Sequence, residues 1–122
     1  MNPEPLLTTV EAQELEYAFR NLLNYDSSDP VSTIDPFTYR APDGDTCLYI
    51  AARQGDIRSV ALLIRGGICA DATGDMGTTA LHCASSREIA DLLVAAGSST
   101  QTLDEFGRKP LDAVNENLER RR

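Results

Sequence analysis

The sequence predicts an all-α fold in which helix-turn-helix units stack side by side as a solenoid, preceded by an N-terminal capping helix. The first observation is a recurrence: GDTCLYIAAR at 44–53 and GTTALHCASS at 77–86 share Gly, Thr, Leu and Ala at the same four offsets, 33 positions apart. The second is that each segment is followed by an apolar run closed by glycine, SVALLIRGG at 59–67 and IADLLVAAG at 89–97. Self-similarity at this period is typical of stacked repeats, in which each unit buries its apolar side against the next.

Residues 8–24, TTVEAQELEYAFRNLLN, are expected to form the capping helix. Thr8 and Glu11 have the spacing of a capping box, which places the start of the helix near them. An apolar stripe at helical spacing follows, made of Leu15, Ala18, Phe19, Leu22 and Leu23. This stripe would cover the first full repeat, where a solenoid otherwise exposes apolar surface.

Residues 25–42 are expected to form an irregular connector. Pro30, Pro36 and Pro42 lie in it among Asp and Ser residues. Proline removes a helical hydrogen bond and clashes with the preceding turn, so a long helix is excluded. A short turn of helix or an extended piece remains compatible with this stretch.

Residues 43–106 are interpreted as two full repeats, each made of a turn, a short helix, a reversal and a second helix. In the second helix of the first repeat, Val60, Leu63 and Ile64 fall on one face. The glycines at 66 and 67 follow, and glycine readily adopts the positive φ with which many helices end. One such helix pair has too little core to stand alone, so the repeats must contact each other.

A third repeat starts at GRKPLDAV, where Gly107, Pro110, Leu111 and Ala113 match the earlier starts at a spacing of 30. It stops after one predicted helix, so residues 107–122 are expected to be a truncated C-terminal capping repeat. The three arginines at 120–122 suit the last turn of that helix, because positive charge interacts favourably with the C-terminal end of the helix dipole.

The pattern resembles the ankyrin-repeat family, whose signature runs G-x-T-P-L-H-x-A-A, then x-x-G-H, then an apolar helix closed by G-A-D-x-N-A. The resemblance covers two repeats over about residues 41–106 and the truncated third. It implies an all-α ankyrin solenoid, and it implies that His82 is a structural residue hydrogen-bonded to Thr79. The matching motif positions include Thr46, Leu48, Gly67, Thr79, Leu81, His82 and Gly97.

The chain also departs from this signature. Cys47 and Ala80 replace the usual proline, and Tyr49 replaces the usual histidine. Between Ala84 and Leu92 the second repeat is three residues shorter than the first. We expect this deletion to shorten the first helix of the second repeat and to flatten the inner wall of the solenoid there.

Charge and composition restrict the partners. The net charge is −8, and residues 1–45 hold nine acids against two arginines, a net charge of −7. Such a surface repels nucleic acid and attracts a basic protein, although the acidity can equally serve solubility alone. Three cysteines without C-x-x-C spacing suit a reducing compartment, and neither a signal peptide nor a membrane span is evident. We expect a cytoplasmic protein that is a monomer when free.

No cofactor, metal site or catalytic site is expected. His82 is the one histidine, and on a helix the adjacent Cys83 would point about 100° away from it, unlike metal ligands at i and i+4. The carboxylate pairs at 43 and 45 and at 104 and 105 lie in predicted turns, where we expect solvated tips. An enzyme that uses Cys83 and His82 is the third alternative considered below.

The resemblance implies that binding uses the turn tips and the inner-helix surface. Met76 and Phe106 are large apolar side chains at positions where polar residues are usual, and such residues are enriched as interface anchors. Alternatively, each folds back onto its neighbours. The candidate partner-binding residues are Asp43, Asp45, Arg53, Gln54, Asp75, Met76, Thr78, Glu105, Phe106 and Arg108.

The sequence therefore predicts a protein-binding module with two open functions. In the first, it is a small stand-alone inhibitor, comparable to an immunity protein against a basic toxin or enzyme, a role associated with some small bacterial members of the ankyrin-repeat family. In the second, it is an adaptor or scaffold that holds partners without inhibiting them.

Overall fold

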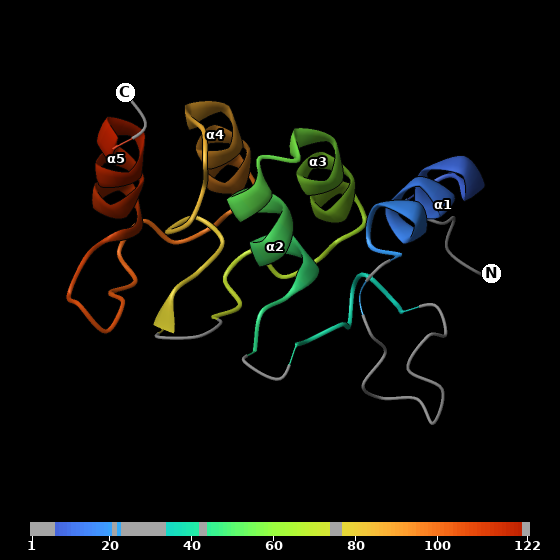
Figure 1. Ribbon diagram of the computed structural model, residues 1–122, viewed down its shortest axis with the longest axis horizontal. Coiled ribbons are helices and arrows are strands. Elements are labelled where there is room, and N and C mark those ends of the chain that lie inside the picture. Colours follow the sequence, from blue (N-terminus) through green and yellow to red (C-terminus); the bar gives the residue numbers. More distant parts are fainter. Residues whose placement is uncertain (1–6, 21, 23–33, 42–43, 74–76, 121–122) are drawn as a thin grey trace.

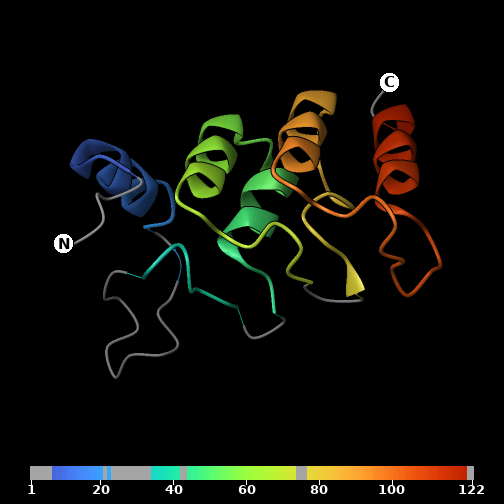
Figure 2. The ribbon, with the colours of Figure 1, turned by 180° about the vertical axis from the view of Figure 1, so that it is seen from behind.

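The computed structural model describes residues 7–20, 22, 34–41, 44–73 and 77–120. In this part of the chain five helices follow one another: α1 (Thr9–Ala18), α2 (Cys47–Gln54), α3 (Ile57–Arg65), α4 (Arg87–Ala95) and α5 (Pro110–Arg120). Figure 1 shows α1, α3, α4 and α5 in a row along the long axis, and Figure 2 confirms that α2 lies in a second layer beside them. The predicted all-α solenoid is confirmed.

Helix α1 begins at the predicted capping box. The Thr8 hydroxyl accepts from the backbone N–H of Glu11 at 3.1 Å, and the Glu11 carboxylate accepts from the backbone N–H of Thr8 at 3.0 Å. The helix ends at Ala18, earlier than the predicted residue 24, and Arg20 donates to the carbonyl of Tyr17 just beyond its end. Residues 21, 23 and 24 lie outside the described residues. Of the predicted stripe, the side chains at 15 and 19 are buried, that at 22 is half-buried and that at 18 is exposed.

The described part of the connector, residues 34–41, contributes to the core instead of running over the surface. A turn forms here because Asp35 accepts from the backbone N–H of Phe37 at 2.9 Å. Ile34 and Tyr39 are buried, and the Phe37 ring lies so close to Gly66 that a Cβ atom there would come within 2.3 Å of it. Gly66 therefore provides room for this ring, while Gly67, with φ of 90°, supplies the left-handed conformation predicted at the end of the helix.

The second repeat lacks the α-helix that corresponds to α2. Residues 80–83 form a turn with i to i+3 bonds, from Cys83 N–H to Ala80 O at 3.2 Å and from Ala84 N–H to Leu81 O at 3.3 Å. Ser85 then donates to the carbonyl of Ala52, which ties this turn to α2. The predicted shortening is confirmed and goes further than expected, because a segment three residues shorter cannot complete a helix before α4 begins.

A single core runs through the stack. Equivalent positions of the two repeats are buried together: Leu48 and Leu81, Ala51 and Ala84, Leu63 and Leu93. Helix α5 closes the far end with buried Ala113 and Val114 and an exposed outer face that includes the acids at 112, 116 and 119. Among the described residues α5 is the last helix of the row, and the arginines at 121 and 122 lie outside them.

Candidate binding surface

Three turns lie along one side of the row of helices (Figures 1 and 2). We call them the first tip (residues 40–46), the second tip (73–79) and the third tip (104–108); residues 42–43 and 74–76 are not among the described residues. At the first tip Ala41 N–H donates to Asp45 O at 3.0 Å, and at the third tip Asp104 N–H donates to Arg108 O at 3.1 Å. The second tip shares the antiparallel bridge of the first, since Arg40 pairs with Thr46 and Thr73 pairs with Thr79. The sequence repeat is therefore also a repeat of backbone geometry.

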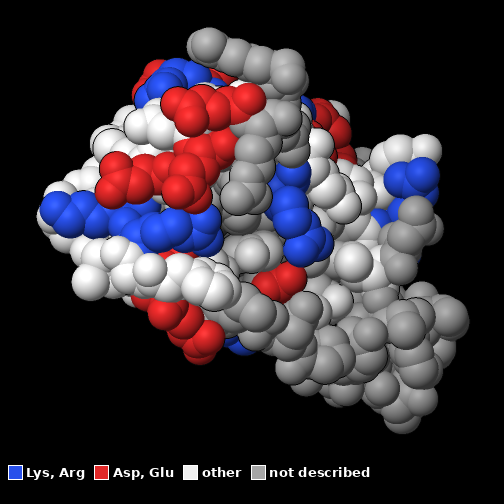
Figure 3. Space-filling model, turned by 60° about the vertical axis from the view of Figure 1, so that its left-hand side comes forward, with Lys and Arg blue, Asp and Glu red and all other residues white. Residues whose placement is uncertain are grey.

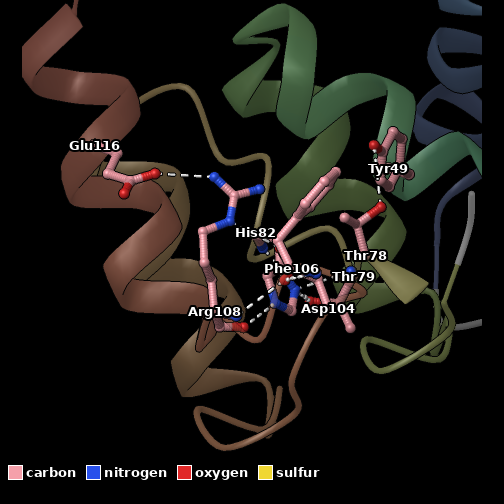
Figure 4. Close-up of polar contacts among 8 residues, drawn as sticks. All are labelled: Tyr49, Thr78, Thr79, His82, Asp104, Phe106, Arg108 and Glu116. Atoms are coloured by element: carbon pink, nitrogen blue, oxygen red, sulfur yellow. Dashed lines mark hydrogen bonds and ion pairs between the residues drawn. The ribbon is translucent and has the colours of Figure 1, made fainter. Parts of the chain in front are cut away.

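The third tip is organised around a buried carboxylate. Asp104 is 6% exposed, and it accepts from the backbone N–H groups of Phe106 and Arg108 and from Arg108 Nε at 2.9, 2.9 and 3.0 Å. Arg108 also donates to Glu116 of α5 at 2.9 Å, so its side chain joins the tip to the last helix (Figure 4). Desolvation opposes ionisation of Asp104, but these hydrogen bonds prevail and lower its pKa. Asp104 was predicted to be a solvated side chain at a turn tip, and this prediction is wrong because the side chain is buried.

Phe106 is presented on this fixed tip. It is 67% exposed, and the Arg108 guanidinium lies 5.4 Å from the centre of its ring. Arg108 itself is half-buried, and Glu105 beside Phe106 is exposed. Phe106 therefore lies beside a neighbouring side chain, while most of its surface stays exposed.

The first tip differs from its prediction. Asp45 is only 5% exposed, and its carboxylate lies 3.8 Å from the Arg53 guanidinium. Arg53 also lies over the Tyr49 ring, 5.6 Å from its centre. Asp45 was expected at a solvated tip, but it turns inward, whereas Arg53 and Gln54 are exposed at the end of α2 as predicted. The candidates Asp43, Asp75 and Met76 lie outside the described residues.

Two side chains at the same motif position reach forward to the next tip (Figure 4). In the first repeat Tyr49 accepts from the hydroxyl of Thr78 at 3.2 Å. In the second repeat His82 occupies this position, and its Nε2 lies 3.1 Å from the carbonyl oxygen of Arg108. Sequence reasoning missed Tyr49, although its place at the histidine position of the motif was the available signal.

His82 is hydrogen-bonded to Thr79, the contact that the resemblance implies. Its Nδ1 lies 3.1 Å from the backbone nitrogen of Thr79 and 2.9 Å from the Thr79 hydroxyl. Because a backbone N–H can only donate, Nδ1 accepts, and the ring proton on Nε2 is left to donate to Arg108 O. The imidazole thus fixes both its own turn and the next tip.

The geometry at Cys83 does not favour nucleophilic chemistry. Its thiol donates to the carbonyl oxygens of Ala80 and Tyr49 at 3.3 and 3.6 Å, away from the partners of the His82 ring. Burial raises the pKa of the Cys83 thiol to about 12, which disfavours the thiolate that a nucleophile requires.

Among the described residues no group of three or more His, Cys, Asp and Glu side chains could hold a metal ion. Nor does any helix in that part of the chain have the length and hydropathy needed to cross a membrane.

Part of the described acidity is paired within the molecule. Glu11 pairs with Arg65 and Glu14 pairs with Arg58, so that two acids of α1 face arginines of α3. On the side that carries α5, acidic and basic side chains lie next to one another (Figure 3). Two of the nine acids of residues 1–45 are therefore paired with arginines further along the chain.

Comparison with known proteins agrees with this geometry. The family model for ankyrin repeats, in three copies, matches residues 9–104. The match takes in α1 and the connector, and it ends before the third start at Gly107. The chain is also 38% identical over 84 residues to a zinc finger CCCH domain-containing protein of Oryza sativa subsp. japonica, a stretch that covers 62% of this chain and 13% of that protein.

Proposed function

Because this chain belongs to the ankyrin-repeat family of protein-binding modules, we propose that it binds its partner through the third tip and the exposed end of α2. The observation that carries this proposal is the Phe106 ring, exposed and mounted on a tip that Asp104, Arg108 and Glu116 hold in place. An aromatic anchor fixed before binding loses little conformational entropy when it enters a partner's pocket. The proposed surface also includes Arg53, Gln54, Thr78, Glu105 and Arg108.

The test compares affinity capture by three forms of the full chain. Phe106→Ala removes the proposed anchor, and Val94→Ala on α4 removes another exposed apolar side chain outside the proposed surface. Truncating a hot-spot residue typically costs about 2 kcal/mol or more, which is roughly a thirtyfold loss of affinity. We expect a protein captured by the wild type to be lost with Phe106→Ala and retained with Val94→Ala. Equal capture by all three forms would refute the proposal.

We further propose that the partner has a basic surface and that binding inhibits it. The net charge of −8 supports this, since a basic partner would be attracted at long range. Among the described acids, Glu16 is exposed and is suited to this attraction. Asp45 is a poor test position because it is buried beside Arg53, and its substitution would disturb the tip.

Inhibitor and adaptor are separated by two measurements on the captured complex. For an inhibitor, affinity falls steeply with salt and falls with Glu16→Lys, and the partner's activity is lost on titration. For an adaptor, the complex forms without loss of the partner's activity. A Cys83 and His82 enzyme would instead require that Cys83→Ser abolish a measured turnover in a protein that remains folded.

The three free cysteines, including the exposed Cys69, support the cytoplasmic location that we propose, because reducing compartments keep thiols unpaired. That the free protein is a monomer is part of the same proposal, and sedimentation velocity measures it directly.

A further inference from the structure

Helix α1 begins in the same way as α3 and α4, the second helices of the two repeats. In each case the side chain of the N-cap residue accepts from the backbone N–H three residues later; the caps are Thr8, Asp56 and Ser86. Counted from these caps, the seventh residue is a buried leucine in all three helices, at 15, 63 and 93. Helix α1 therefore corresponds to the second helix of a repeat.

The fourth residue after the cap distinguishes α1 from the other two helices. It is Val60 in α3 and Ala90 in α4, and both are buried. In α1 it is Ala12, which is exposed. Helix α2 packs against α3 from the second layer, whereas none of the described helices lies in that layer beside α1 (Figure 1). The face of α1 that carries Ala12 therefore lacks the cover that the equivalent faces of α3 and α4 have.

A groove of about 460 Å³ borders this face of α1. It is lined from α1 by Ala12, Leu15 and Glu16, and from the other side by the turn at 34–37. Leu15 and Ile34 are buried, so they form an apolar floor. Packed protein interiors have few voids larger than a water molecule. The volume instead lies within the range of about 300–1,000 Å³ that is typical of binding pockets.

The charged side chains among the described lining residues are both acids. They are Glu16, which is exposed on α1, and Asp35 in the turn. The arginines at 58 and 65 of α3 are paired with other acids of α1. An apolar segment that carries a lysine or an arginine is therefore complementary to this groove in both shape and charge.

We propose that the groove binds a short amphipathic helix of a partner protein. Its apolar side chains contact Leu15 and Ile34, and a lysine or arginine lies beside Glu16. The bound segment is a helix because it takes the place beside α1 that α2 takes beside α3, and proteins commonly recognise amphipathic helices in apolar grooves. The groove and the third tip lie at opposite ends of the row, so this site does not depend on Phe106 (Figure 1).

Chemical-shift mapping on the full chain with synthetic peptides tests this. One peptide is an amphipathic helix with leucines at i, i+3 and i+4 flanked by lysines, and the other has glutamates in place of the lysines. We expect the lysine peptide to shift the amide signals of residues 12–16 and of the turn at 34–37, and to leave those of α5 unchanged. Glu16→Lys lowers the affinity for the lysine peptide and raises it for the glutamate peptide, each by roughly three- to tenfold.

A pair of matched variants tests the groove itself. Ala12→Phe fills the groove with the chain's own side chain, and Ala18→Phe is the control, because Ala18 is also an exposed alanine of α1 but does not line the groove. We expect Ala12→Phe to abolish binding of the lysine peptide and Ala18→Phe to retain it, with circular dichroism showing that both variants are folded. Phe106→Ala binds this peptide as the wild type does, which separates the groove from the third tip.

Four results would overturn the proposal. The first is that neither peptide shifts the signals of the groove, and the second is that both peptides bind the wild type equally. The third is that Ala12→Phe and Ala18→Phe have the same effect on binding. The fourth is that the signals of the groove shift with protein concentration alone, because this would assign the groove to a second copy of the chain.

Discussion

In the first repeat the residues after the tip form the helix α2, whereas in the second repeat the corresponding residues 80–83 form a turn. Both nevertheless bury the same leucine and alanine of the motif, at 48 and 51 and at 81 and 84. The helix itself is therefore not what places the motif residues in the core.

What the two repeats share is a side chain that reaches forward. Tyr49 bonds to the side chain of Thr78, and His82 bonds to the backbone of Arg108. In the second repeat His82 also accepts from the backbone N–H of Thr79. The comparison indicates that the imidazole ties its own turn to the next tip.

The largest effect is expected for Leu81→Ala. Truncating a fully buried leucine costs about 2–5 kcal/mol, and the turn around Leu81 has no helix to hold it once the side chain is gone. Leu48→Ala removes the same atoms from the equivalent position, but α2 persists around it, so we expect a smaller loss. Urea unfolding of the two variants measures the difference, and a larger cost for Leu48→Ala would contradict the comparison.

An intermediate effect is expected at the forward-reaching side chains. His82→Ala leaves the N–H of Thr79 and the carbonyl of Arg108 without this partner in a buried region, which typically costs about 1–3 kcal/mol. Tyr49→Phe removes one half-buried hydroxyl, with an expected cost of about 0.5–1.5 kcal/mol. The same unfolding measurement checks both. If Tyr49→Phe proved as costly as His82→Ala, the special role of the imidazole would be refuted.

The smallest effect concerns acid stability of the third tip. The pKa of Asp104 in the folded protein lies below the ordinary value of 3.8. The carboxylate's contribution to the free energy of unfolding is therefore fully present above pH 3.8, and it is lost as the pH falls through the folded pKa. Compared with the wild type, Asp104→Asn should therefore have a lower free energy of unfolding at neutral pH, and that free energy should fall less when the pH is lowered. Thermal unfolding at a series of pH values tests this, with Glu105→Gln as the control. A wild-type profile in Asp104→Asn would show that the carboxylate does not organise the tip.

The order of the repeats and the ends of their second helices could be predicted from sequence. Glycine, threonine and leucine recur at a fixed spacing, and a glycine closes each apolar run where the second helix ends. The deletion after Ala84 also indicated a shorter first helix. That it leaves only a turn depends on contacts with α2, such as Ser85 to Ala52, which local pattern does not contain.

The burial of Asp45 and Asp104 could not be predicted in the same way. Composition makes turn acids look solvated, but each carboxylate turns inward toward an arginine. Which arginine it meets depends on the path of the chain around the tip. Phe106 was identified correctly as exposed, whereas Tyr49 was missed because its partner Thr78 lies in the next repeat.

Secondary chemical shifts across the two repeats test the central comparison most directly. We predict helical Cα shifts for the eight residues of α2, non-helical shifts for residues 80–83, and slow exchange of the Thr79 amide in the wild type that is lost in His82→Ala. Helical shifts at 80–83 equal to those of α2, or a Thr79 amide that exchanges at the rate of an open loop, would contradict the account.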